Sequence, residues 1–341
     1  ETIPKPKASE SVWSDSDPVV LVLTIGFILL FVGASVVDAD YVADLIGHGF
    51  SWTAKYLGSF FQLFLLLTFF VAVATGVSGA GRARIGGLDE PEIGRFRWLS
   101  MIMCTLLAGG GVFFAAGEPV YHFVVTPPAF DTEAASPAAV APALAQSFMH
   151  WGFLAWAVLG SLTAIVLSRA HYSQGQPLQP RTLLYPVLGE RVVSGRLGGV
   201  VDAACVIAVV AGTVGPIGFL ATQMSFGLHE LFGVSDGYGT QLMVLAVLAG
   251  VYMTSAMTRL HRGIQLLSRF NVILALVIAG VIFVFGPTLF LTDVYLQSMG
   301  EYLGSFFSMA TMTAQTAPDW WMKWWTVFFF AWFIGYTPLM A

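Results

Sequence analysis

Residues 18–37, PVVLVLTIGFILLFVGASVV, decide the fold class. This stretch carries no charge, and a helix needs about 20 mostly apolar residues to cross the hydrocarbon core of a bilayer. Similar apolar segments follow at about 56–79, 98–117, 143–168, 197–227, 238–257, 271–291 and from 320 onward. The sequence therefore predicts an all-α integral membrane protein with eight spanning helices.

The composition supports the membrane class. Of the 341 residues, 57% are hydrophobic and 10% are charged, whereas soluble domains carry about 25% charged residues. The sequence contains no Walker A, HExxH or GxSxG pattern, so an enzyme is not expected. We also expect no nucleic-acid partner. The two cysteines, Cys104 and Cys205, lie in apolar runs, and no CxxC or Cys/His cluster indicates a metal.

Basic residues alternate along the predicted connections. The connections after the second, fourth and sixth spans are basic, and the others are mostly acidic. By the positive-inside rule the N-terminus lies in the cytoplasm, and we expect a multi-pass protein of the inner (plasma) membrane. The basic residues are Arg82, Arg84, Arg95, Arg97, Arg169, Arg181, Arg191, Arg196, Arg259, Arg262 and Arg269.

Three glycines, Gly109, Gly110 and Gly111, interrupt the third span. Glycine costs about 1 kcal/mol per residue inside a helix, and transporters use such weak points to aim backbone groups at ions and substrate. Close packing of small residues between helices is the competing interpretation. We expect an irregular or unwound helix near 108–111.

Aromatic residues gather in the fourth and eighth spans. Trp151 and Trp156 lie five residues apart, about 140° around an ideal helix, so both can edge a cavity or belong to an interfacial belt. In the eighth span, Trp332, Phe333 and Tyr336 lie deep beside Thr337-Pro338. Such rings can enclose a quaternary ammonium group, or they can pack against lipid and other helices.

Few ionisable residues fall within the spans. Glu118, His150 and Asp202 all lie near predicted span ends. Ionisable residues at membrane depth are functional by default. Their positions nevertheless predict solvated or capping roles, with Glu118 next to an extracellular loop.

Several motifs together resemble the betaine/choline/carnitine transporter (BCCT) family. They are AGGGVFFAAGEP at 108–119, HWGFLAWAVL at 150–159, PVLGE at 186–190 and the Trp-rich stretch 320–339. The resemblance implies an inverted five-helix-repeat fold of the leucine-transporter type, with twelve helices and a trimeric assembly. The abrupt apolar end at Ala341 then suggests a chain that stops within helix 8.

The resemblance also implies a division of the chain. Residues 1–17 form a cytoplasmic tail, and 18–97 form two peripheral helices and a basic loop. Residues 98–292 form the first repeat of the transport core, helices 3–7. Residues 293–319 form an amphipathic interfacial helix, and 320–341 begin the second repeat.

The implied function is import of a quaternary-ammonium or related zwitterionic osmolyte, such as glycine betaine, choline, carnitine or a sulfonium analogue, by alternating access. The substrate residues carried over are Trp151, Trp156, Trp332, Phe333 and Tyr336, whereas the family's tyrosine near the second tryptophan is Leu159. An inverted-repeat transporter for an amino acid or other small zwitterion is the alternative.

The coupling ion is also inferred from the resemblance. Proton-coupled members tend to carry an aspartate where this chain has Gly110, which favours sodium. Carbonyl groups of the broken third helix, at Ala108 to Gly111, and the Thr213 hydroxyl are the expected ligands. No resident metal or cofactor is expected.

Overall fold

A computed structural model describes residues 17–85, 90–91, 93–106, 109–159, 161–257, 263–313 and 315–340. Within these ranges the chain forms helices and no strand, which confirms the all-α class. Among the described residues, six helical stretches are long and apolar enough to cross a membrane: Pro18–Val37, Ala39–Val77, Pro137–Gln174, Arg196–Phe232, Tyr238–Ser255 and Gln265–Phe285. The protein is therefore a multi-pass membrane protein.

The chain divides into two compact units. The first contains Glu1–Gly87, Ala155–Ala211 and Met322–Ala341, and the second contains Leu88–Leu154 and Gly212–Trp321. Neither unit is continuous in sequence, so each is assembled from helices that are distant along the chain.

The first unit contains two long N-terminal helices. An aspartate caps the start of each: the Asp17 carboxylate accepts from the Val19 amide, and the Asp38 carboxylate accepts from the Tyr41 amide, both at 2.9 Å. The elements of this unit are α1 (Pro18–Val37), α2 (Ala39–Val77), η1 (Gly79–Arg82), most of α6 (Phe153–Val158), α7 (Ser161–Gln174), η3 (Pro180–Leu184), α8 (Tyr185–Leu188), α9 (Glu190–Ser194), the first part of α10 (Arg196–Phe232), η4 (Met322–Ala331) and α16 (Trp332–Met340).

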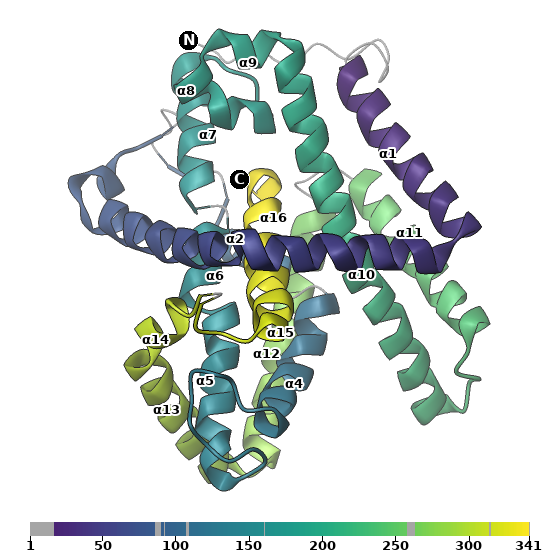
Figure 1. The fold of residues 1–341 in the computed structure, drawn as a ribbon, viewed down its shortest axis with the longest axis vertical. Helices are drawn as coiled ribbons and strands as arrows, with labels where there is room; N and C mark the ends of the chain where they lie inside the picture. Colours follow the sequence, from purple (N-terminus) through teal and green to yellow (C-terminus); the bar gives the residue numbers. More distant parts are fainter. Residues whose placement is uncertain are drawn as a thin grey trace. The chain divides into compact units, whose positions relative to one another are not determined.

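Helix α2 packs against η4 within this unit, and Figure 1 shows the yellow C-terminal segment crossing α2. The contact is close at Gly58, where an added Cβ would lie 2.7 Å from Met322 Cε. The second span was predicted to begin near residue 56, but α2 begins at Ala39. The difference arises because the cap at Asp38 starts a helix well before the apolar run.

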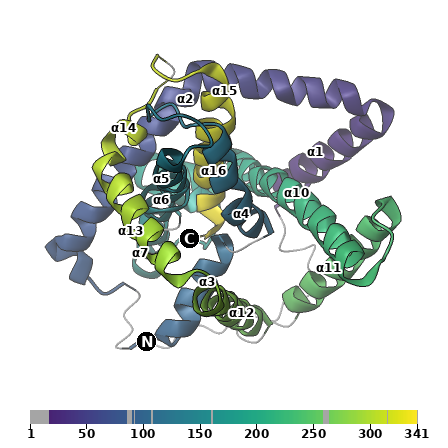
Figure 2. The ribbon, with the colours of Figure 1, turned by 90° about the horizontal axis from the view of Figure 1, so that it is seen from below.

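The second unit is built around α5. This helix packs against α4 and α13, while α3 packs against α12 (Figure 2). The elements are α3 (Arg95–Leu106), α4 (Gly109–Val124), η2 (Pro137–Ala139), α5 (Val140–Trp151), the last part of α10, α11 (Tyr238–Met257), α12 (Gly263–Phe285), α13 (Thr288–Gly304), α14 (Phe306–Ala310) and α15 (Asp319–Trp321).

Two predicted boundaries in this unit are wrong. The seventh span, predicted at 271–291, is α12, which ends at Phe285 because Gly286 and Pro287 follow. Proline lacks the amide hydrogen that would continue the helix. The amphipathic helix predicted from residue 293 consequently begins at Thr288, directly after this proline.

The predicted fourth span is interrupted at Gly152. This residue has φ −96° and ψ −128°, and it separates α5 from α6. The Phe153 amide beyond the break donates to the Tyr302 hydroxyl at 3.1 Å. An added Cβ at Gly152 would lie 2.9 Å from that same hydroxyl oxygen, so the break requires a residue without a side chain.

Candidate functional site

Trp151 is held by side chains from α4. Its indole Nε1–H donates to Glu118 Oε2 at 2.7 Å, and its ring lies 6.2 Å from the ring of Phe114, between centroids. Glu118 Oε1 also contacts His150 Nδ1. One carboxylate of α4 therefore fixes two consecutive residues at the end of α5.

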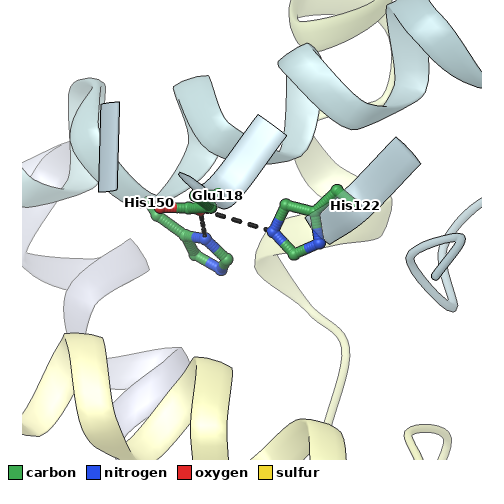
Figure 3. A group of neighbouring side chains, drawn as sticks. All are labelled: Glu118, His122 and His150. Carbon is green, nitrogen blue, oxygen red and sulfur yellow. Dashed lines mark hydrogen bonds and ion pairs between the residues drawn. The ribbon is translucent and has the colours of Figure 1, made fainter. Parts of the chain in front are cut away.

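Glu118 also contacts a histidine of its own helix. His122 Nε2 lies 3.4 Å from Glu118 Oε1, one helical turn further along α4. Figure 3 shows the carboxylate between the two imidazole rings. Donor atoms of Glu118, His122 and His150 all lie within 4.8 Å of one another, so the three residues together offer the ligand set of a metal ion.

The solvated or capping role predicted for Glu118 and His150 is wrong. Glu118 is 1% exposed and His150 is 2% exposed. Glu118 lies six residues before the end of α4, about 9 Å at 1.5 Å per residue. His122 was not among the residues predicted from the sequence, although Glu118 and His122 at i, i+4 share a helix face and could have indicated the cluster.

A second aromatic group lies in the first unit, on α16. The ring centroid of Trp332 lies 5.3 Å from that of Phe333 and 6.3 Å from that of Tyr336. Phe333 is buried, whereas Trp332 and Tyr336 are half-buried. The Thr337 hydroxyl, hydrogen-bonded to the Val158 carbonyl at 2.9 Å, attaches α16 to the end of α6. Three of the five predicted substrate residues therefore form one cluster.

Trp156 belongs to the same unit as this cluster, and Trp151 belongs to the other. Trp156 lies on α6 and is 36% exposed. Leu159, at the position where the resemblance implies a tyrosine, is 7% exposed. An apolar side chain fills that position without needing a hydrogen-bond partner.

The predicted ion-binding residues lie on two helices of the second unit. Gly109, Gly110 and Gly111 form the first turn of α4, and α3 ends at Leu106, so the irregularity expected near 108–111 stays a prediction. Ala108 lies outside the described residues. Thr213 lies within α10, which is helical through Gly215 and Pro216.

A buried ion-pair network organises the first unit. Arg181 donates through Nε to Asp202 Oδ2 and through its terminal nitrogen to Asp17 Oδ2, both at 2.6 Å. The Arg181 backbone amide also donates to Asp202 Oδ1 at 2.6 Å. Hydrogen bonding to Arg181 holds the pKa of the Asp17 carboxyl below its usual range. Asp202, predicted to be solvated or capping, is instead paired.

The helical architecture, with six stretches among the described residues long and apolar enough to cross a membrane, defines the class of a multi-pass membrane protein. Residues 19–341 match the model of the BCCT, betaine/carnitine/choline family transporters, and the chain belongs to this family. The predicted resemblance is thereby confirmed.

Several curated proteins are similar to this chain. Glycine betaine transporter 2 of Vibrio parahaemolyticus is 48% identical over 92% of this chain and 58% of its own length. Glycine betaine transporter OpuD of Bacillus subtilis is 31% identical over 87% of this chain and 56% of its own length. The betaine/ectoine transporter LcoP of Corynebacterium glutamicum is 30% identical over 95% of this chain and 52% of its own length. The chain thus spans somewhat more than half of these relatives.

Proposed function

We propose that the protein containing this chain is a secondary active transporter that imports a methylated zwitterionic osmolyte, with glycine betaine as the first candidate. The observation that carries the proposal is the group of Trp332, Phe333 and Tyr336 on α16, in a chain of the BCCT family. Aromatic faces attract a quaternary ammonium ion, which cannot donate a hydrogen bond. The relatives named as betaine transporters support the same substrate class.

Substrate binding tests this proposal directly. We expect the purified protein to bind glycine betaine or a related methylammonium or sulfonium compound, and Trp332→Ala to weaken binding. Loss of one aromatic face from a desolvated cage costs about 2 kcal/mol, roughly thirtyfold in affinity. Trp324→Ala is the matched control, because Trp324 is an exposed tryptophan of η4, 54% accessible, outside the cluster.

The competing hypothesis is a carrier of an amino acid or another small zwitterion. A primary ammonium group needs hydrogen-bond acceptors, which bare aromatic faces do not supply. Competition by unlabelled amino acids in the same assay therefore separates the two hypotheses. Amino acids that displace the bound ligand while betaine does not would contradict the proposed substrate class.

We further propose sodium coupling. A sodium site needs only oxygen ligands, and Gly110 occupies the position at which proton-coupled members tend to carry an aspartate. The Thr213 hydroxyl on α10 is the candidate ligand that the structure describes. Uptake into proteoliposomes should fall when potassium replaces sodium at fixed pH, and undiminished uptake in potassium would remove sodium coupling.

The orientation and the assembly remain part of the proposal. The basic connections favour a cytoplasmic N-terminus in the plasma membrane, which cysteine labelling at Arg84 from either side of the membrane tests. A homotrimer with α13 at its interface is favoured by an apolar stripe at a spacing of seven residues: Leu289, Leu296 and Leu303 are 83%, 62% and 55% exposed. Leu296→Glu should then reduce the oligomer that chemical cross-linking captures.

A further inference from the structure

We propose that Glu118, His122 and His150 form a binding site for a late first-row divalent metal ion, with Zn²⁺ as the representative occupant. The three donor atoms come from two neighbouring helices, α4 and α5, and converge within 4.8 Å (Figure 3). One carboxylate with two imidazoles is a ligand set that binds zinc with a fourth position open. Imidazole ligands favour Zn²⁺, Cu²⁺ or Ni²⁺ over the hard cations Mg²⁺ and Ca²⁺.

The distance between Glu118 and His122 fits tetrahedral coordination. Two ligands that are each about 2.0–2.1 Å from a tetrahedral zinc ion stand about 3.4 Å apart. His122 Nε2 and Glu118 Oε1 are separated by 3.4 Å. His150 Nδ1 contacts the same oxygen at a short hydrogen-bond separation, so metal binding requires this imidazole to move away from the carboxylate by about 1 Å. No change of backbone is needed for the first pair.

Burial and charge favour a cation at this position. Glu118 is 1% exposed, and His122 is 0% exposed. An ionised carboxylate removed from water requires compensation by a cation or by strong hydrogen bonds. The ion-pair partners described for Glu118 are the two histidines, which carry a charge only when protonated. A divalent metal supplies the compensating charge while both imidazoles stay neutral.

Gln146 provides an independent argument from the surroundings of the site. Its amide nitrogen lies 3.1 Å from His150 Nε2, and among the described residues its Oε1 is buried without a hydrogen-bond partner. A metal-ligating histidine usually donates its other ring N–H to a nearby oxygen. Rotating the amide by 180° places Oε1 to accept from His150 Nε2–H when Nδ1 binds the metal, and the two amide orientations are nearly equal in shape.

An aromatic side chain covers the cluster. The ring centroid of Trp321 lies 5.6 Å from that of His122 and 6.1 Å from that of His150, and Trp321 is 3% exposed. This apolar cover excludes water and strengthens the electrostatic attraction between the ligands and a cation. Because Glu118 Oε2 also accepts the Trp151 indole hydrogen bond, a metal on Oε1 would hold the carboxylate that orients a predicted substrate residue.

The test is metal binding by the whole protein, purified without an affinity tag. Titration with Co²⁺, followed by the visible absorption of tetrahedral cobalt, should show one site per chain, and Zn²⁺ should abolish the signal by displacement. The decisive variant is His122→Gln, which retains a hydrogen-bond donor toward Glu118 but removes a strong metal ligand. We expect this variant to lose the signal.

Two further variants separate this site from other sources of binding. Gln146→Ala should weaken binding by about 10–100-fold, the usual effect of removing an outer partner. His229→Ala should leave binding unchanged, because His229 is an exposed histidine of α10 outside the cluster.

Absence of cobalt or zinc binding at millimolar concentration would overturn the proposal. The three residues would then form a hydrogen-bonded Glu–His network that holds no metal. Unchanged metal binding in His122→Gln would also overturn the proposal, because the bound metal would then be an adventitious ion only. Neither outcome depends on the transported substrate, so the metal site and the proposed transport function are tested separately.

Discussion

Replacing Arg181 by methionine tests how strongly one guanidinium stabilises the first unit. The substitution keeps a long side chain but removes the N–H donors that pair with Asp202 and Asp17. The side chain of Asp202 is 8% exposed and that of Asp17 is 30% exposed. The Arg181–Asp202 pair is therefore buried, whereas the Arg181–Asp17 pair is partly exposed to solvent.

The expected cost follows from this difference in burial. Breaking a buried ion pair by removing one partner costs about 3–5 kcal/mol, because the remaining charge is left uncompensated. The Arg181–Asp17 pair contributes at most about 1 kcal/mol, because water screens the attraction between its charges. We therefore expect Arg181→Met to destabilise the protein by about 3–5 kcal/mol, and Asp17→Asn by about 1 kcal/mol or less.

The assay is equilibrium unfolding in mixed detergent micelles, with a double-mutant cycle on Arg181 and Asp202. Adding Asp202→Asn to Arg181→Met should recover part of the lost stability, because the orphaned charge is then removed. A loss below about 1 kcal/mol for Arg181→Met would refute the reasoning, since that is the range of exposed pairs. An Asp17→Asn loss as large as that of Arg181→Met would also contradict it.

Three further predictions use the same stability measurement. Gly198→Ala should cost at least about 1–3 kcal/mol through overpacking, because the new Cβ would collide with the Val192 backbone carbonyl oxygen and would also lie 2.8 Å from Arg181 Cδ. Gly215→Ala, with nothing within 4 Å of the new Cβ, is the control. Tyr302→Phe should cost about 1 kcal/mol by removing the acceptor of the Phe153 amide, and an unchanged stability would contradict that role. The hydrogen bond to Arg181 lowers the pKa of the Asp17 carboxyl from its ordinary value, so its contribution to stability should be complete above the unfolded-state pKa and lost as the pH falls through the lower folded-state pKa. Asp17→Asn should remove this acid-dependent part, and an identical acid profile in the variant would contradict it.

Helix α1 could be predicted to the residue, at 18–37, and α11 begins at Tyr238 as expected. The prediction of α1 succeeded because its apolar run is uninterrupted and is flanked by Asp17 and Asp38. The start of helix α12 was predicted too far along the chain. Its first turns contain the polar residues Gln265, Ser268 and Arg269, and a prediction from apolar runs leaves such turns out.

The buried cluster around Glu118 could not be predicted from the same kind of analysis. The position of a residue within an apolar segment gives its distance from the end of the span. It does not show which residues of other helices lie beside it. His150 lies 32 residues further along the chain than its Glu118 partner, and only the packing of α5 against α4 brings the two together. The i, i+4 pair on α4 was visible in the sequence, but its burial was not.

The break in the fourth helix shows the same limit and affects the proposed substrate site. A backbone amide freed inside a membrane needs a new partner, and here it is the hydroxyl of Tyr302, 149 residues away from Phe153. No local signal distinguishes Gly152 from the three glycines of α4, where the irregularity was expected. Because the break lies between Trp151 and Trp156, the angle of about 140° calculated for a continuous helix does not apply to this pair. The direction of each indole depends instead on its own contacts, which for Trp151 are those with Glu118 and Phe114.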